Sequence, residues 1–480
     1  MAQDTKPCLP VSTLLAGDLP RQLYHALAWA LKTRLFAAIK PHGNTRWQAH
    51  ELILLILFWV WSDCPTLTGA FTHASQLCQR LLGKIIFKSY TGFSDALTTW
   101  TAKLIPLLWK QIHQRMEQIA GPYWRIGLWL PLAVDGSRTT TPRTRQNERV
   151  FCPRKYGRGK HARSRAKWKN KKRRSKKLPH AVAPQIWLTL LWHIGLRMPW
   201  AWICGPSNAC ERHHFVDVIK TQKFPDKTLF CGDAGFVGYE VWNTLIQHGH
   251  HFLIRVGGNI RLLRRLGDIR VRGELVHFWP KQAFQKKQPP LILRLLKFRA
   301  GRRTIFVVTN VLAESQLTTA QAERIYKARW GVEVQFRTLK QTFGRAKLQS
   351  RTPERAYQEL QWSLIGLWLV QLLSATEQIP IGIGPERSSP SVAIQIFQDA
   401  MSRGRPRSLR QELQGAVNDT YQRKSQKAAR YRPKSKDRPA TGKPKVVYAS
   451  ARHRHKYKLW FGLQKSLTAL PLRERVSGAA

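Results

Sequence analysis

The hydrophobic pattern changes its period near residue 125, and this change constrains the fold more than any other feature of the sequence. Residues 12 to about 120 carry apolar positions at helical spacing, as in LPRQLYHALAWALKTRLFAAI, and predict a set of helices. After Gly121 and Pro122 the pattern turns into short apolar runs of strand length, the first being GLWLPLAVDGS. The chain is therefore expected to combine a helical N-terminal domain with a sheet flanked by helices, an α+β or α/β class.

Strands and helices alternate along the next part of the chain. The runs AVAPQIWLTLLWHIG, KTLFCGDAGF and HFLIRVGG each predict a strand, whereas CERHHFVDVIKTQ and YEVWNTLIQHG predict helices. From 258 to about 312 the pattern is typical of hairpins, with LILRLLKFRAGRRTIFVVTNV pairing two strands across Ala300 and Gly301. Thr318 and Gln321 predict a capping box that opens one long helix, which includes YKARWGVEVQFRTLK.

The charge balance indicates the class of partner. Lys and Arg number 81 against 27 Asp and Glu, which gives a net charge of +54 and favours a polyanion. In the segment 154–177, 14 of 24 residues are Lys or Arg, so we expect a solvated loop. The apolar runs 52–61 and 361–373 are shorter than the roughly 20 residues that a membrane span needs, and both predict buried helices. Nucleic acid is therefore favoured over a membrane, and the N-terminus does not resemble a secretory signal.

The cysteines favour a reducing compartment. There are 7 of them, an odd number without any CxxC pair, which is typical of free thiols in a cytosolic protein. Cys204, Cys210, His213 and His214 are close enough in sequence to suggest zinc. Their spacing matches no standard zinc motif, so ordinary packing is the preferred interpretation.

Three acidic residues stand out by their context. Asp135 and Asp233 each follow an apolar strand and are followed by Gly within two residues, which leaves room for a metal ion and a substrate backbone. Glu333 lies on the predicted long helix. On a continuous helix it would share a stripe roughly 80° wide with four other side chains, Tyr326, Arg329, Arg337 and Lys340. Carboxylates that hold two divalent ions about 3.5–4 Å apart, beside phosphate-binding cations, are suited to phosphodiester cleavage.

Each of these residues also has an ordinary interpretation. An Asp before Gly at a strand end is commonly a turn former, and Glu333 can be an i,i+4 ion-pair partner of Arg329 or Arg337. The basic segments can be nonspecific tails or nuclear targeting signals, a pattern that KNKKRRSKK fits. The combination of features is what favours a catalytic site.

The spacing Tyr-x2-Arg-x3-Glu-x6-Lys of residues 326–340 resembles the YREK signature of IS-four-like DDE transposases of bacterial insertion sequences. AVDGS around Asp135 and GDAGF around Asp233 are similar to the contexts of that family's first and second catalytic Asp. The order Asp, Asp, Glu, with separations of 98 and 100 positions, is compatible with the family. The resemblance covers about residues 125–375.

The resemblance implies an RNase H-like catalytic core, a mixed sheet flanked by helices, with a β-rich insertion. It divides the chain into a helical DNA-binding domain over 1–122, the first part of the core over 123–257 with the basic loop 154–177, the insertion domain over 258–317, the last part of the core over 318–378, and a basic C-terminal region over 379–480. Asp135, Asp233 and Glu333 would hold two Mg²⁺ (or Mn²⁺) ions. The expected DNA contacts are Tyr326, Arg329, Arg337, Lys340 and, against a flipped base, Trp279.

The resemblance also implies a function. A transposase would bind the terminal inverted repeats of an insertion sequence as a homodimer on paired ends, cleave the DNA and join it to target DNA, in the bacterial cytoplasm at the nucleoid. Two alternatives stay open at this stage. One is a non-catalytic nucleic-acid-binding protein derived from a transposase, and the other is an RNase H-like structure-specific nuclease.

Overall fold

The computed structural model describes residues 18–32, 47–152, 183–266, 274–300, 303–402, 408–418 and 442–468, with a few single positions between 36 and 45. The chain forms two compact units, each built from separate segments. Unit 1 comprises 1–124, 135–211 and 331–425, and unit 2 comprises 125–134, 212–330 and 426–480. The predicted basic loop 154–177 lies outside the described residues.

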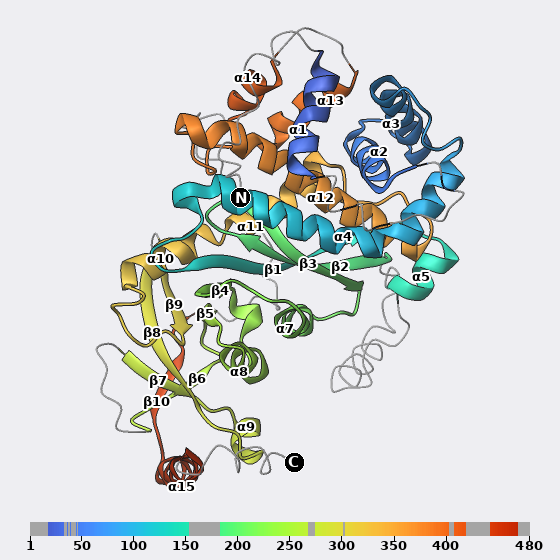
Figure 1. Ribbon diagram of the computed structural model, residues 1–480. Helices are drawn as coiled ribbons and strands as arrows, with labels where there is room; N and C mark the ends of the chain where they lie inside the picture. The colour runs from blue at the N-terminus through green and yellow to red at the C-terminus, as the bar shows by residue number, and fades with distance from the viewer. Residues whose placement is uncertain are drawn as a thin grey trace, which may run out of the picture. The chain divides into compact units, whose positions relative to one another are not determined.

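Unit 1 is built around one long buried helix. α12 (Pro353–Gln378) packs against α4 (Tyr90–Ala120) and α2 (Ala49–Trp61). The remaining helices of this side, coloured blue and orange in Figure 1, are α1 (Leu19–Ala30), α3 (Leu67–Leu82), α13 (Pro390–Ser402) and α14 (Leu409–Gln414). The Trp61 indole nitrogen donates a hydrogen bond of 3.1 Å to the Gly366 carbonyl oxygen, which joins α2 to α12 in the core.

By length and composition, one helical stretch among the described residues could cross a membrane, Pro353–Ile381, which contains α12. The window that passes this test is 83% buried inside the protein. The apolar run 361–373 therefore belongs to a longer helix than the sequence predicts. Its buried surroundings agree with the predicted core helix.

The strands of unit 1 lie against α4 and α12 (Figure 1). β2 (Gln185–His193) and β3 (Met198–Pro206) form an antiparallel hairpin whose register shifts at Leu191 and Trp192. β1 (Leu130–Thr140) starts in unit 2 and continues along the chain into unit 1, where α5 (Arg145–Phe151) follows it.

Unit 2 contains a mixed sheet. Its strand order is β10-β6-β7-β8-β9-β5-β4-β1. The pairs β1–β4 and β4–β5 are parallel, and β5, β9, β8, β7 and β6 pair antiparallel in succession. The bounds are β4 (Thr228–Gly232), β5 (His251–Val256), β6 (Arg261–Arg264), β7 (Glu274–Phe278), β8 (Leu291–Ala300), β9 (Arg303–Thr309) and β10 (Lys445–Tyr448).

Helices accompany these strands in unit 2. α8 (Tyr239–Gln247) packs on β5 and β8. The other helical segments are α7 (Glu211–Thr221), η4 (Ala234–Phe236), α9 (Lys281–Gln285), α10 (Thr319–Ala328) and α15 (Ala451–Thr468). Parallel strands with helical connections, followed by antiparallel hairpins, give the RNase H-like α+β class that the sequence predicts.

The prediction of one long helix after residue 318 was wrong. The capping box is present, because the Thr318 hydroxyl accepts from the Gln321 N–H at 3.1 Å and the Gln321 side chain accepts from the Thr318 N–H at 3.1 Å. However, α10 ends at Ala328, a separate α11 (Gly331–Arg337) follows, and a π-helical turn, η5 (Thr338–Thr342), completes the segment. Tyr326 and Lys340 therefore do not lie on one continuous helix, and the predicted 80° stripe does not exist as such.

Close packing fixes the start of α11. A Cβ atom added to Gly331 would lie 2.0 Å from Cη2 of the Trp192 indole. The helix can approach the β2–β3 hairpin this closely only because position 331 has no side chain.

Candidate active site

Asp233 directly follows the strand β4, whereas Asp135 lies inside the parallel neighbour β1, which continues to Thr140. The prediction that Asp135 ends its strand was therefore wrong, because the polar residues after it continue the extended backbone. In unit 2, Ala133 of β1 pairs in register with Cys231 of β4. Two positions further along the chain in each case are Asp135 and Asp233. The carboxyl ends of parallel strands meet at the same edge of a sheet, which is where α/β proteins commonly build their sites.

Asp135 lies in unit 1, and the carboxylate of Glu211 lies beside the next residue, Gly136. The Asp135 Oδ1 accepts the backbone N–H of Gly136 at 2.8 Å, which orients the carboxylate. A Cβ atom at Gly136 would lie 2.6 Å from Oε2 of Glu211 and 3.1 Å from the Trp187 indole. Glu211 is the first residue of α7 and was not singled out from the sequence, because nothing in CERHH distinguishes it from an ordinary helix-start acid.

Lys340 lies next to the same end of β1 in unit 1. Its Nζ donates a 2.7 Å hydrogen bond to the Ser137 hydroxyl, two residues after Asp135. Burial lowers the pKa of Lys340. Glu333 is half-buried in the first turn of α11, where a carboxylate interacts favourably with the helix dipole.

In unit 2, Asp233 belongs to a group of charged and aromatic residues. Its Oδ1 accepts the Gly235 N–H at 2.7 Å and thereby caps η4. Tyr326 is 6% exposed, and the Arg329 guanidinium lies 5.8 Å from the centre of its ring. Burial raises the pKa of Tyr326, the positive charges of Arg329 and Arg255 lower it, and the Asp233 carboxylate raises it.

This group brings Asp233, Tyr326 and Arg329 within electrostatic reach of one another. Arg255 on β5 adds a cation that the sequence analysis missed, since an Arg within an apolar strand carries no signal of its own. Arg329 occupies the break between α10 and α11 and is 9% exposed.

Trp279 lies in a hydrophobic cluster of unit 2. It is 6% exposed, its indole nitrogen donates to the Gln288 carbonyl at 2.8 Å, and its ring meets Phe284 edge-on. The cluster includes Leu263, Leu266, Ala283, Phe284, Ala449 and Tyr457. Through this packing, Trp279 joins the α9 segment to the C-terminal β10–α15 segment within unit 2.

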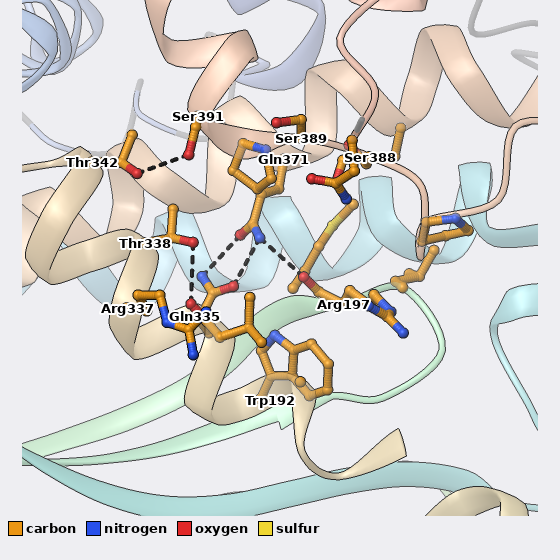
Figure 2. Close-up of a pocket in the computed structure, with 18 of the residues that line it drawn as sticks. Trp192, Arg197, Gln335, Arg337, Thr338, Thr342, Gln371, Ser388, Ser389 and Ser391 are labelled. Carbon is orange, nitrogen blue, oxygen red and sulfur yellow. Dashed lines mark hydrogen bonds between the residues drawn. The ribbon is translucent and has the colours of Figure 1, made fainter. Parts of the chain in front are cut away.

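Arg337 is exposed at the end of α11 and lines a cavity of about 200 Å³ within unit 1 (Figure 2). The cavity lies between α11–η5, the β2–β3 hairpin and the N-terminal end of α13. Gln335 and Gln371 exchange side-chain hydrogen bonds of 2.8 and 3.0 Å in its wall.

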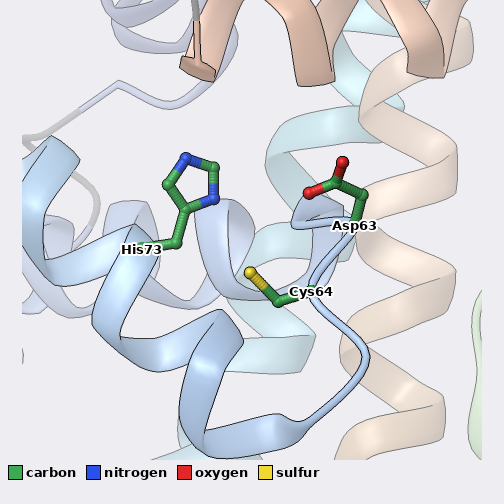
Figure 3. A group of neighbouring side chains, drawn as sticks. All are labelled: Asp63, Cys64 and His73. Atoms are coloured by element: carbon green, nitrogen blue, oxygen red, sulfur yellow. The ribbon is translucent and has the colours of Figure 1, made fainter.

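Among the described residues, one group of three or more metal-ligand side chains has its ligand atoms within 4.8 Å of one another. It consists of Asp63, Cys64 and His73, at the turn between α2 and α3 (Figure 3). The His73 Nδ1 lies 3.2 Å from the Ser62 hydroxyl. The cluster of Cys204, Cys210, His213 and His214 that the sequence suggested does not form such a group.

The residues of the three predicted acidic positions fit a divalent cation. Carboxylate oxygens are the hard ligands that Mg²⁺ and Mn²⁺ prefer. Asp135 and Asp233 are both half-buried, and each is oriented by a backbone N–H bond to one oxygen. A side chain at Gly136 would crowd the Glu211 carboxylate, because its Cβ would lie 2.6 Å from Oε2.

Parts of the chain are similar to known proteins. The family described as Transposase DDE domain matches residues 130–369, which is half of the 480-residue chain. The transposase InsG for insertion sequence element IS4 of Escherichia coli strain K12 is 26% identical over 271 residues, 54% of this chain and 55% of the relative. The chain thus spans about half the length of this curated relative.

A solved structure of the piggyBac transposase synaptic complex with hairpin DNA is 12% identical and covers 85% of this chain and 84% of that chain. Its TM-score of 0.33 is too low to support any detailed correspondence. The family match, residues 130–369, includes Asp135 on β1, Asp233 directly after β4 and Glu333 on α11. The chain belongs to the DDE transposase family.

Proposed function

We propose that the protein binds the terminal inverted repeats of an insertion sequence, cleaves the DNA there and joins the ends to target DNA. The observation that supports the proposal is the parallel register of β1 and β4, in which Ala133 pairs with Cys231, two residues before Asp135 and two before Asp233. Glu333, on the separate helix α11, is the third acid of the proposed site.

The three carboxylates would hold two Mg²⁺ ions, or Mn²⁺ in their place. Such ions supply a nucleophile at neutral pH and stabilise the leaving oxygen of an in-line displacement. The role of the protein is to fix the carboxylates, through the N–H groups of Gly136 and Gly235, and to hold the DNA strand.

The cations around these acids would contact phosphate. Lys340 donates to the Ser137 hydroxyl on β1, two residues along the strand from Asp135. Arg329 and Tyr326 lie within electrostatic reach of Asp233, and a guanidinium there would bind a phosphate oxygen while the phenol donates to another. Because burial disfavours the charge on Lys340, a nearby phosphate would stabilise its protonated form.

The proposed partner is double-stranded DNA, both the element's ends and the target. The net charge of +54 supports it, since neutralising phosphates releases counterions and makes affinity steeply salt-dependent. We propose a homodimer on paired ends, in the cytoplasm at the nucleoid.

The experiment starts with the DNA that flanks the gene. Imperfect inverted repeats around the reading frame, bounded by a short direct duplication, supply the cleavage substrate. We expect wild-type protein to nick or cut this substrate in Mg²⁺, and Asp233→Asn or Glu333→Gln to bind it with unchanged affinity and not cut. Glu240→Gln, an exposed acid in the first turn of α8, is the matched control and should cut normally.

Two outcomes would count against the proposal. Cleavage by Asp233→Asn at the wild-type rate would show that the site is elsewhere. Tight binding without cleavage by the wild type would favour the non-catalytic DNA-binding protein, and cleavage of branched DNA without dependence on the repeats would favour a structure-specific nuclease.

A further inference from the structure

The cavity between α11–η5, the β2–β3 hairpin and the start of α13 has several hydrogen-bond donors in its lining. It is bounded on one side by Arg337 and Thr338 and on the other by Arg197 (Figure 2). Part of the wall is polar, with the hydroxyl and amide groups of Gln341, Thr342, Ser388, Ser389, Ser391 and Asn418. Apolar residues that include Leu196, Met198 and Val334 line another part. At about 200 Å³ it would hold roughly six water molecules by their share of liquid volume of ~30 Å³ each, enough for a phosphodiester group and part of its sugar.

A buried donor in the wall has no partner. Trp192 is 2% exposed, and its indole N–H makes no hydrogen bond to any of the described residues. Figure 2 shows this nitrogen turned toward the cavity, near the side of Arg197 and Gln371. A buried N–H without an acceptor is unfavourable, so an acceptor that enters the cavity would remove this penalty.

Arg197 is held in place at the mouth of the hairpin. It has a φ of 58°, a left-handed conformation that is strained for a residue other than Gly. The Gln371 amide donates to its carbonyl oxygen at 3.0 Å. Gln371 in turn binds Gln335 of α11, so a hydrogen-bonded chain connects the strained Arg197 to the helix that carries Glu333.

The charges favour an anion. Burial lowers the pKa of Arg197, and the exposed carboxylate of Glu386 raises it in part. A guanidinium stays protonated at any ordinary pH, so Arg197 keeps its charge in a partly desolvated position. Arg337 adds a second positive charge that lines the same space.

We propose that this cavity binds a backbone phosphate of a DNA strand, clamped by Arg197 and Arg337 and bonded by the neutral donors between them. The proposal rests on the proposed function and pairs Arg337, a sequence-predicted DNA contact, with Arg197, which the sequence analysis did not single out. A strand bound there would fix α11, and with it Glu333, through Gln335.

The test is the salt dependence of DNA binding, measured by fluorescence anisotropy on duplex DNA without Mg²⁺. Each phosphate contact contributes about 0.9 to the slope of log Kd against log salt concentration. We expect Arg197→Gln to lower the slope by about that amount and Arg197→Lys to restore most of it. Arg149→Gln, which removes the same charge from an exposed position on α5, should leave the slope nearly unchanged.

Thermal unfolding completes the design. The Arg197→Gln variant should melt within a few degrees of wild type. Adding inorganic phosphate distinguishes a site for free phosphate from a site for a DNA backbone phosphate. Suppose that inorganic phosphate raises the melting temperature of the wild type but not of Arg197→Gln, and that both proteins have the same slope of log Kd against log salt concentration. The cavity then binds free phosphate and not DNA, and the proposal is wrong. Equal slopes without any phosphate effect also overturn it.

Failure of the proposed function gives a different result. Wild-type protein that shows the Arg197-dependent slope but never cleaves DNA would contradict the cleavage proposal and leave the phosphate site standing. Normal cleavage together with equal slopes for wild type and Arg197→Gln would support the cleavage proposal and contradict the phosphate site.

Discussion

Replacing Gly331 with Ala tests how closely α11 must approach the β2–β3 hairpin. The added Cβ would lie 2.0, 2.7 and 2.9 Å from three atoms of the Trp192 six-membered ring, whereas ordinary contacts start near 3.4 Å. The helix or the indole must therefore move by more than an ångström. Overpacking of this kind costs about 1–3 kcal/mol. A Gly-to-Ala gain in helix propensity offsets at most about 1 kcal/mol of that cost.

The expected result is a fall in the thermal unfolding midpoint of about 2–10 °C, measured by calorimetry or circular dichroism. Gly92→Ala is the matched control, because its nearest neighbours would be 3.6 and 3.7 Å away in the first turn of α4. Trp192→Phe removes the ring atoms that clash, so Gly331→Ala should cost less in that background. An equal loss of stability in both backgrounds, or no loss at all, would refute the steric argument.

Three further predictions address other parts of the molecule. Burial lowers the pKa of His113 from 6.5 to about 4, so between these pH values the folded state binds fewer protons than the unfolded state. The free energy of unfolding should therefore fall by up to about 3 kcal/mol as the pH drops from 6.5 to 4. His113→Gln should weaken this pH dependence, and an unchanged pH profile would contradict the assignment. Gly136→Ala should lower Mg²⁺-dependent cleavage at least tenfold, about 1.4 kcal/mol, without changing DNA affinity, because the added Cβ would crowd Glu211. Gly238→Ala is the control, since its Cβ would lie 3.8 Å from the nearest atom, and it should cleave normally. Equal activities of the two variants would refute the crowding argument. Trp279→Ala should lose about 3–5 kcal/mol of stability while Trp279→Phe loses much less, whereas a loss of DNA affinity at unchanged melting temperature would return Trp279 to the DNA contacts.

Local patterns in the sequence predicted most of the elements that carry the site. The apolar runs before Asp135 and Asp233 became parts of β1 and β4, and the two predicted hairpin strands became β8 and β9, whose antiparallel pairing reaches Ala300 and Arg303. These features depend on residues close in sequence, where periodicity and turn chemistry are informative. The parallel register of β1 with β4 could only be inferred from the family resemblance, since it joins residues almost a hundred positions apart.

What the sequence did not predict arises from contacts between distant segments. The break between α10 and α11 depends on the fit of Gly331 against Trp192, and the helical spacing alone continued through it. Glu211 gained significance only when it was found beside Gly136. The pairing of β10 with β6 was missed because KVVY is a four-residue run inside a basic segment, too short to give a strand signal.

The most direct test of the account is Mg²⁺-dependent cleavage of a duplex carrying the element's own terminal repeat, comparing wild type, Asp233→Asn and Glu240→Gln at saturating protein. The account predicts cutting at the repeat boundary by wild type and Glu240→Gln, and none by Asp233→Asn despite equal DNA binding. Cleavage by Asp233→Asn at the wild-type rate would contradict it.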